Sequence, residues 1–304
     1  MFELSLSLAP IFLLIALGWT FRRSGFPQEE FWLAAQRLVH FLLFPALLLS
    51  WLATADLTDV KVTPLIAAVA ASVMVMALAV MMIGWKLISG GPVFASVFQG
   101  SIRFNAYLGA AAAAVLFGRD GEMLAAIVIA VMVPLGEALS IVALGRQAGR
   151  NTPSFGILST SLIRNPLILA ILAGIFLNTT GIGLPSISET FVDFLGRAAL
   201  PIGLLCVGAS FDLSGLGKSL KPILATTTLK LLVMPVFMLV ACSTFGISGL
   251  AAKVALLFAA LPPSLPSYNV ARQLGDDAKL ISNLMTIATL VGLVTLPAIM
   301  FIYD

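Results

Sequence analysis

Long apolar stretches without a single charge most constrain what this chain can fold into. Residues 62–85 and 280–303 contain no Asp, Glu, Lys or Arg, and each exceeds the ~20 residues that a helix needs to cross a bilayer. Hydrophobic residues make up 60% of the chain and charged residues 10%, against roughly 45–50% and 25% in soluble domains. Because a soluble fold of this size could not bury so much apolar surface, the sequence predicts an all-α integral membrane protein.

Ten apolar segments are predicted to span the membrane as helices. They lie at residues 4–21, 31–53, 63–85, 92–117, 123–144, 157–177, 190–210, 222–243, 250–272 and 279–302. The seventh is the least regular, because Asp193 and Arg197 occupy its first half. The loops between the segments are short and leave no room for a soluble domain.

The basic residues divide unevenly between alternate loops. One side of the membrane collects Arg22, Arg23, Lys86, Arg146, Arg150, Lys218, Lys221, Arg272 and Lys279, and the other has Lys61, Arg119 and Lys253. Cytoplasmic loops carry the excess of Lys and Arg, so both termini are expected to be extracytoplasmic in a multi-pass protein of the cell (inner) membrane, surrounded by lipid. The scattered basic residues form no stripe, which argues against binding of nucleic acid.

The two halves of the chain resemble each other at a nearly constant spacing. Pro10 and Pro166 are 156 residues apart, and the same spacing relates Gly18 to Gly174, Gly25 to Gly181, Pro45 to Pro201, and Asp56-Leu57 to Asp212-Leu213. This pattern predicts a first repeat over residues 1–150 and a second over 151–304. Since five spans is an odd number, the second repeat would enter the membrane from the opposite side, an architecture common among secondary transporters.

The fourth and ninth spans occupy equivalent places in the repeats, and both are interrupted. Pro262, Pro263 and Pro266 remove three backbone donors from the ninth span, so a continuous helix is not expected there. The fourth span contains two glycines and a polar cluster over residues 100–109. One interpretation is a pair of kinked helices; the other is two discontinuous helices that cross at the midplane and direct their positive N-terminal dipoles at an anion.

The polar residues around these interruptions are the predicted substrate site. The predicted substrate-binding residues are Arg103, Asn105, Tyr107, Ser264, Ser267, Tyr268 and Asn269. Asn105 offers both a donor and an acceptor to a ligand. Charges in mid-span usually face the bundle interior and have a partner, so Glu137 is expected to neutralise Arg103 or Lys230, an interpretation favoured over a role as proton carrier.

Enzyme chemistry finds little support in the sequence. A single histidine, His40, excludes an HExxH motif and a multi-histidine metal site. Gly217-Lys218-Ser219 resembles the end of a phosphate loop, but Asp212 stands where that motif needs its first glycine. We therefore expect no enzymatic activity, no bound metal and no cofactor, and any driving force would be an ion gradient, a membrane potential or the substrate gradient.

Two short motifs resemble those of a known family. Residues 103–109, RFNAYLG, resemble the R-F-N-T-Y-x-G signature of bacterial auxin efflux carrier family transporters, with Ala106 where Thr is usual. Residues 269–277, NVARQLGDD, look like that family's second-half signature, A-R-x-x-G-x-D. The resemblance covers essentially the whole chain. It departs from the plant members at the crossover of helix four, where they have a proline and this chain has none between Pro92 and Pro134.

The resemblance implies a specific architecture and function. Ten helices would form two inverted five-helix repeats, with helices four and nine crossing. Helices 1, 2, 6 and 7 would form a scaffold and the remaining six a moving transport domain, and a homodimer through the scaffold is a further partner to consider. Plant members export auxin, and bacterial relatives are assigned to malonate, malate and similar organic anions, so a small organic anion is the expected substrate. The alternatives are a sodium- or proton-coupled carrier of a related crossover fold and, from a different class, a membrane-embedded sensor or enzyme subunit.

Overall fold

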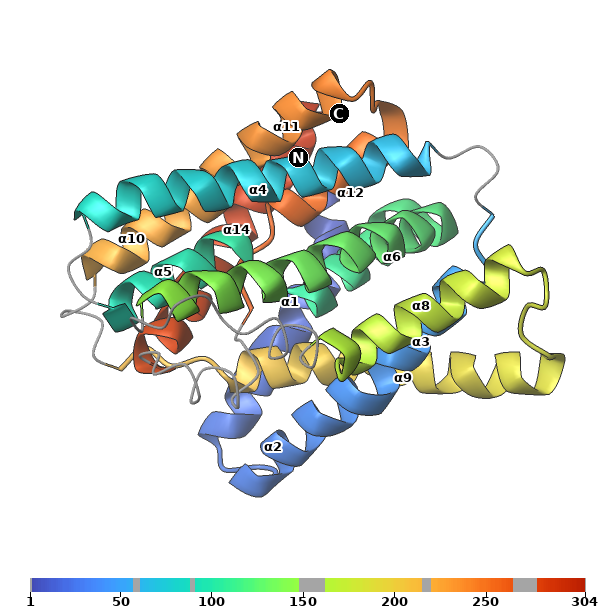
Figure 1. The fold of residues 1–304 in the computed structure, drawn as a ribbon. Coiled ribbons are helices and arrows are strands. Elements are labelled where there is room, and N and C mark those ends of the chain that lie inside the picture. The colour runs from blue at the N-terminus through green and yellow to red at the C-terminus, as the bar shows by residue number, and fades with distance from the viewer. Residues whose placement is uncertain are drawn as a thin grey trace. The chain divides into compact units, whose positions relative to one another are not determined.

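The structure is a computed structural model that describes residues 2–56, 61–87, 91–147, 162–214, 220–264 and 278–303 (Figure 1). All regular structure within these ranges is helical, and they contain no strand. The helices are α1 (Phe2–Arg23), α2 (Glu29–Leu38), η1 (Val39–Leu43), α3 (Phe44–Ala53), α4 (Val62–Leu87), α5 (Gly91–Ile102), α6 (Ala106–Gln147), α8 (Pro166–Thr179), α9 (Ser186–Ala209), α10 (Leu220–Thr228), η3 (Leu229–Val233), α11 (Met234–Thr244), α12 (Gly249–Ala259) and α14 (Ala278–Tyr303). The predicted all-helical class is thus confirmed.

Seven helical stretches within the described ranges are long and apolar enough to cross a membrane. One of them, Val93–Ala143, is 51 residues long. It covers all but one residue of each of the predicted fourth and fifth spans and includes the non-helical residues 103–105. Two shorter apolar helices, α8 and α12, occupy the predicted sixth and ninth spans. At 14 residues and 1.5 Å per residue, α8 is about 21 Å long, shorter than a bilayer core. The protein is therefore a multi-pass membrane protein, and the count of ten spans stays a prediction.

Local sequence explains where several helices begin and bend. The predicted sixth span begins at residue 157, and residues 157–161 lie outside the described residues. Within the described part, α8 begins at Pro166, where Asn165 caps it by accepting a hydrogen bond from the Leu167 amide at 2.9 Å. Within α6, Gly118 has φ 59° and ψ −146°, a conformation that favours glycine. This kink separates the predicted fourth and fifth spans where their boundary was expected.

The helices divide into two compact units, each described here by itself. Unit 1 comprises residues 1–62, 107–130 and 163–210, and unit 2 comprises residues 63–106, 131–162 and 211–304. Unit 1 thus contains the predicted spans one, two, six and seven together with the segment around Gly118. Unit 2 contains α4, α5, α10, η3, α11, α12 and α14, with the end of α6.

Two tight helix pairs build unit 1. Helix α1 packs along α9, and α3 packs along α8. A Cβ atom on Gly18 would lie 2.0 Å from the carbonyl oxygen of Leu205, and one on Gly208 would lie 1.8 Å from that of Ile15. On Gly174 it would lie 2.8 Å from the Cβ of Leu52. Small residues at these crossings let the backbones approach closely, as is usual between membrane helices.

The same local features recur at corresponding positions of the two halves. Gly18 and Gly174 both sit at close helix crossings. Gly25 and Gly181 both have positive φ, at 75° and 69°, just after a helix. The pairing of helix one with seven and of two with six is what a two-fold inverted repeat would give. These observations support the repeat, which stays a prediction.

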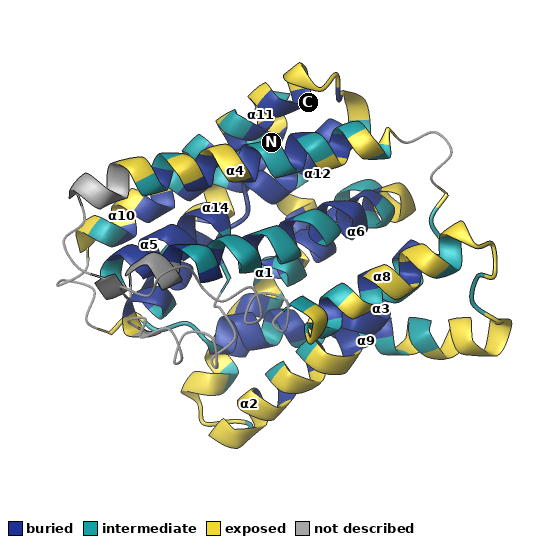
Figure 2. Ribbon diagram, viewed as in Figure 1, coloured by how far each residue is buried: buried dark blue, intermediate teal, exposed yellow. Residues whose placement is uncertain are grey.

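Unit 2 has the more completely buried interior. Helix α5 packs against α10 and α14, and α12 packs against α11 and α14. Every residue from Val254 to Pro263 is buried, as Figure 2 shows for α12. Large apolar side chains are instead exposed on the outer faces of both units, including Leu13, Phe176, Phe194, Leu232 and Val294. Such exposure is expected where lipid is the solvent.

Candidate functional site

The fourth span is broken within unit 2. Helix α5 ends at Ile102 and the next helix begins at Ala106, leaving residues 103–105 non-helical. The side chains of Phe104 and Asn105 are buried, with 7% and 1% of their surface exposed. Asn105 directly precedes the first residue of α6, which is the position where asparagine favours the start of a helix. The break falls within the polar segment that the sequence singled out.

The ninth span is also interrupted, where the prolines predicted it. Helix α12 ends at Ala259, and residues 261–264 are non-helical. The amide of Asn105 donates a hydrogen bond to the carbonyl oxygen of Pro262 at 2.9 Å. Beside it, the rings of Phe104 and Phe258 meet edge to face at 5.6 Å. A backbone hydrogen bond thus joins the two interruptions inside unit 2.

Arg103 faces a carboxylate rather than open space. Its guanidinium forms an ion pair with Glu137 at 3.1 Å, and donates a longer hydrogen bond of 3.4 Å to the side-chain oxygen of Gln99. Only 18% of the Arg103 side chain and 12% of the Glu137 side chain are exposed. The pair is therefore electrically neutral as a unit and mostly buried, so Arg103 cannot give a substrate its full positive charge without losing Glu137.

A small cavity lies beside the two breaks in unit 2. It is lined by Ser96, Gln99, Gly100, Pro263, Ser264, Ile281, Leu284 and Met285. Its volume of about 10 Å³ is room for about one water molecule. Ser264 lines this cavity, and the other described substrate-site predictions, Arg103, Asn105 and Tyr107, do not. A carboxylate would need more space, so any ligand site here has to open by movement of the adjacent segments.

Of the remaining predicted site residues, Tyr107 is described by the structure and the others are not. Tyr107 belongs to unit 1, where its ring meets Phe44 edge to face at 4.8 Å and lies on the backbone of Gly203. Arg103, Asn105 and Ser264 belong to unit 2. The predicted residues Pro266, Ser267, Tyr268 and Asn269 lie outside the described residues, and so does the second family-like motif, residues 269–277. The roles of these residues stay predictions.

Lys230 is the other buried cation of unit 2. It lies in η3, a π-helical turn in the predicted eighth span, and its side chain is 0% exposed. The sequence offered Glu137 as a partner for either Arg103 or Lys230, and the structure pairs Glu137 with Arg103. Lys230 instead donates a hydrogen bond from Nζ to the carbonyl oxygen of Ala259 at 3.1 Å, the last residue of α12.

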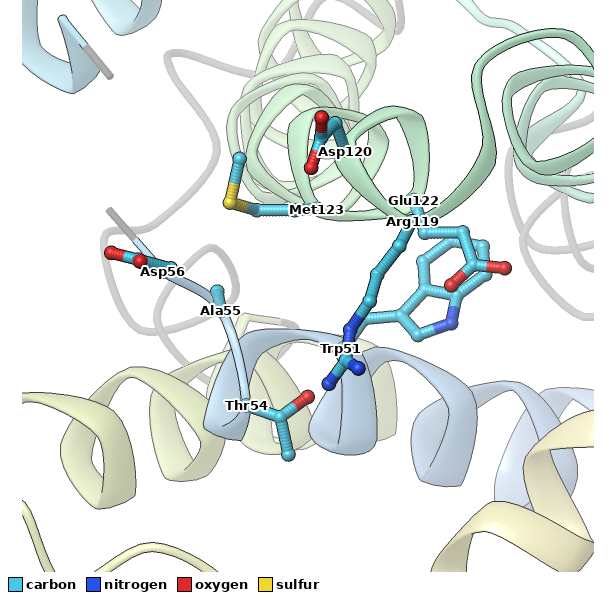
Figure 3. A pocket seen from close by; sticks show the side chains of 8 residues that line it. All are labelled: Trp51, Thr54, Ala55, Asp56, Arg119, Asp120, Glu122 and Met123. Atoms are coloured by element: carbon cyan, nitrogen blue, oxygen red, sulfur yellow. The ribbon is translucent and has the colours of Figure 1, made fainter. Parts of the chain in front are cut away.

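A larger pocket, of about 230 Å³, belongs to unit 1. Figure 3 shows its lining side chains, with Arg119 extending from α6 toward α3. The lining residues are Trp51, Thr54, Ala55, Asp56, Arg119, Asp120, Glu122 and Met123. Three carboxylates against one guanidinium give the lining an acidic balance, which disfavours an organic anion. The sequence of this region indicates a repeat but does not predict a pocket.

Two comparisons with known proteins bear on identity. A family described as membrane transport protein matches residues 152–300. An uncharacterized transporter of Methanothermobacter thermautotrophicus is 24% identical over 293 residues, which cover 94% of each chain. The relative extends the likeness over the first half, where the family match does not reach. Together with the motif at the break in the fourth span, these matches support an assignment to the auxin efflux carrier family of membrane transport proteins.

Proposed function

We propose that the protein is a secondary transporter that moves a small organic anion, a carboxylate, across the cytoplasmic membrane by alternating access. The observation that carries this proposal is the hydrogen bond between Asn105 and Pro262, which joins two helix breaks in a buried interior. Non-helical backbone at membrane depth is tolerated only where it is buried in protein or lines a cavity. In secondary transporters such breaks form the substrate site.

The local chemistry at the breaks suits an anion. Helix α6 begins inside unit 2 next to Asn105, and the first amides of a helix carry partial positive charge and lack intrahelical partners. This partial positive charge attracts a carboxylate, and the amide group of the Asn105 side chain is of a type that can donate to one. Ser264 contributes a hydroxyl from the opposite break.

The division into two units supports a moving-domain mechanism. Unit 1 contains spans one, two, six and seven, the set that the family resemblance assigns to the scaffold. Unit 2 contains both helix breaks and the buried ion pair. Alternating access would then result from movement of unit 2 relative to unit 1. Residues 107–130 group with unit 1, so the second half of helix four would act as part of the scaffold rather than of the transport domain.

A ligand screen of the purified protein tests this function. A ligand that binds only the folded state raises apparent stability, by about 2.7 kcal/mol at one hundred times its Kd. We expect one or more small mono- or dicarboxylates to raise the melting temperature, with their neutral amides as matched controls. The same carboxylate should then cross the membrane of reconstituted vesicles. Stabilisation by sodium or by neutral solutes, with none by any carboxylate, would instead favour the cation-coupled carrier.

A further inference from the structure

The positive charge of Lys230 is only partly balanced by the described groups around it. Its Nζ contacts the carbonyl oxygen of Ala259, so one of its three N–H groups is accounted for. The end of a helix carries roughly half a negative charge, which matches only part of a full ammonium charge. Among the described residues, the ion pairs are Arg22 with Glu29, Arg103 with Glu137, and Arg197 with Asp193; Lys230 is in none of them.

The helices that surround Lys230 bring no described carboxylate to it. The turn η3 packs against α5 and α14 and continues from α10 into α11. Helices α5, α10, α11, α12 and α14 contain no Asp or Glu at all. A fully buried charge is costly in an apolar interior unless an opposite charge or several hydrogen bonds accompany it. A lysine at this position therefore needs an explanation beyond packing.

The position of Lys230 connects it to the helix breaks. Ala259, its acceptor, lies three residues before Pro262, whose carbonyl oxygen receives the amide of Asn105. Both α5 and α14 pack against η3 and also line the small cavity next to Ser264. One turn before Lys230, the methyl group of Thr226 closely approaches Gly100 of α5. This face of the eighth span is thus turned toward the cavity-lining helix.

We infer that Lys230 supplies the positive charge that holds the carboxylate group of the transported anion. The inference rests on the proposed function. It assigns the selectivity of transport for a negative charge to Lys230, which is not among the predicted substrate-binding residues. Arg103 is already matched by Glu137. Within the described part of the chain, Lys230 donates one hydrogen bond, to Ala259, which leaves two N–H groups for a carboxylate. The cavity in this structure has room for about one water molecule. Binding therefore includes an outward movement of residues 261–264, which opens space for the carboxylate next to Lys230.

The test compares the affinities of an anion and of its neutral analogue in three proteins. The wild type, Lys230→Met and the control Lys221→Met are titrated with malonate and with malonamide, and the Kd is obtained from the shift in melting temperature. Lys221 lies in the same span as Lys230 but is exposed. We expect Lys230→Met to weaken malonate binding about ten- to a hundred-fold, the usual effect of losing a charge-assisted hydrogen bond. Binding of malonamide should change little, and Lys221→Met should match the wild type.

The outcomes separate the two proposals. If no carboxylate of the screen binds the wild type, the proposed function fails, and the role of Lys230 fails with it. If the wild type binds malonate and Lys230→Met binds it equally well, only the role of Lys230 is overturned. Replacing a buried charge by an apolar residue of similar size is often neutral or stabilising, so the variant is expected to fold. Lys230→Gln, which can still donate to Ala259, gives a second comparison: unchanged malonate affinity in this variant also overturns the inference.

Discussion

The backbone amide of Asn105 lies 2.9 Å from the carbonyl oxygen of Pro262. The two residues are far apart in the chain, yet each belongs to a helix break within unit 2. Prolines in the ninth span free carbonyl groups because they lack the amides that would otherwise donate to carbonyl oxygens of the preceding turn. One freed carbonyl accepts an amide that the broken fourth span leaves available. Each break thus satisfies part of the hydrogen bonding that the other lacks.

Removing this single backbone donor should destabilise the protein. Asn105→Pro deletes the amide and leaves the buried Pro262 carbonyl without it, at a cost of about 1–3 kcal/mol. Asn105→Ala keeps the amide and removes only the side chain, so it is the matched control. We expect a lower melting temperature for the proline variant than for the alanine variant, measured on purified protein. Equal melting temperatures would mean that the hydrogen bond contributes nothing to stability.

The features predicted from the sequence are those that local chemistry determines. Pro262 and Pro263 exclude a continuous helix whatever surrounds them, and the break at Arg103 falls in a segment rich in polar residues. The pairing of Glu137 could not be decided, because its two candidate partners depend on how distant helices pack. The acceptor of Lys230 is a backbone carbonyl, which no residue type reveals. Tyr107 was assigned to the site from its motif, but its ring packs on Phe44 and Gly203 in unit 1.

The close crossing of α1 and α9 gives a test of packing in unit 1. Gly18→Ala would place a methyl group 2.0 Å from the carbonyl oxygen of Leu205, so the helices must separate and lose contacts. Overpacking of this kind costs about 1–3 kcal/mol. Gly136→Ala is the control, because no neighbouring atom lies within 4 Å of a Cβ there and alanine favours a helix. In thermal unfolding, Gly18→Ala should have a lower melting temperature than the wild type, and Gly136→Ala should not.

The prolines of the ninth span are predicted to keep it open for the substrate. Replacing Pro263 and Pro266 with alanine restores two backbone donors and should let a longer helix form. Transport in reconstituted vesicles should be abolished while the protein remains folded, as judged by gel filtration and its melting temperature. Pro297→Ala in α14 removes a helix proline away from the break and should retain transport. Full activity of the double variant would show that the break has no role in transport.

The predicted orientation can be tested with single cysteines. In a background without Cys206 and Cys242, both of which are buried, Ser24→Cys and Gln147→Cys should be shielded from an impermeant thiol reagent in intact cells. Permeabilised cells should label both. Thr180→Cys lies in an exposed turn on the opposite predicted side and should label without permeabilisation. Rapid labelling at Ser24 in intact cells, with protection at Thr180, would reverse the topology.

Variants of Arg103 and Glu137 can separate the structural role of their ion pair from a role of Arg103 in substrate binding. The two side chains are 3.1 Å apart and less than a fifth exposed. Arg103→Gln leaves Glu137 buried without its partner, and Glu137→Gln does the same to Arg103. Breaking a buried pair from either side costs on the order of 3 kcal/mol, so both single variants should melt at lower temperature. The double variant should recover most of that stability, because two neutral amides can hydrogen-bond to each other.

Ligand affinity in the same variants decides whether Arg103 also binds substrate. If the role of Arg103 is structural, the double variant should recover both the melting temperature and the anion affinity of the wild type. If Arg103 contacts the anion directly, the double variant should regain stability but remain roughly ten- to a hundred-fold weaker in affinity. Because the pair is neutral in this structure, we expect the first result. That result would leave Asn105 and Lys230 as the proposed hosts of the anion.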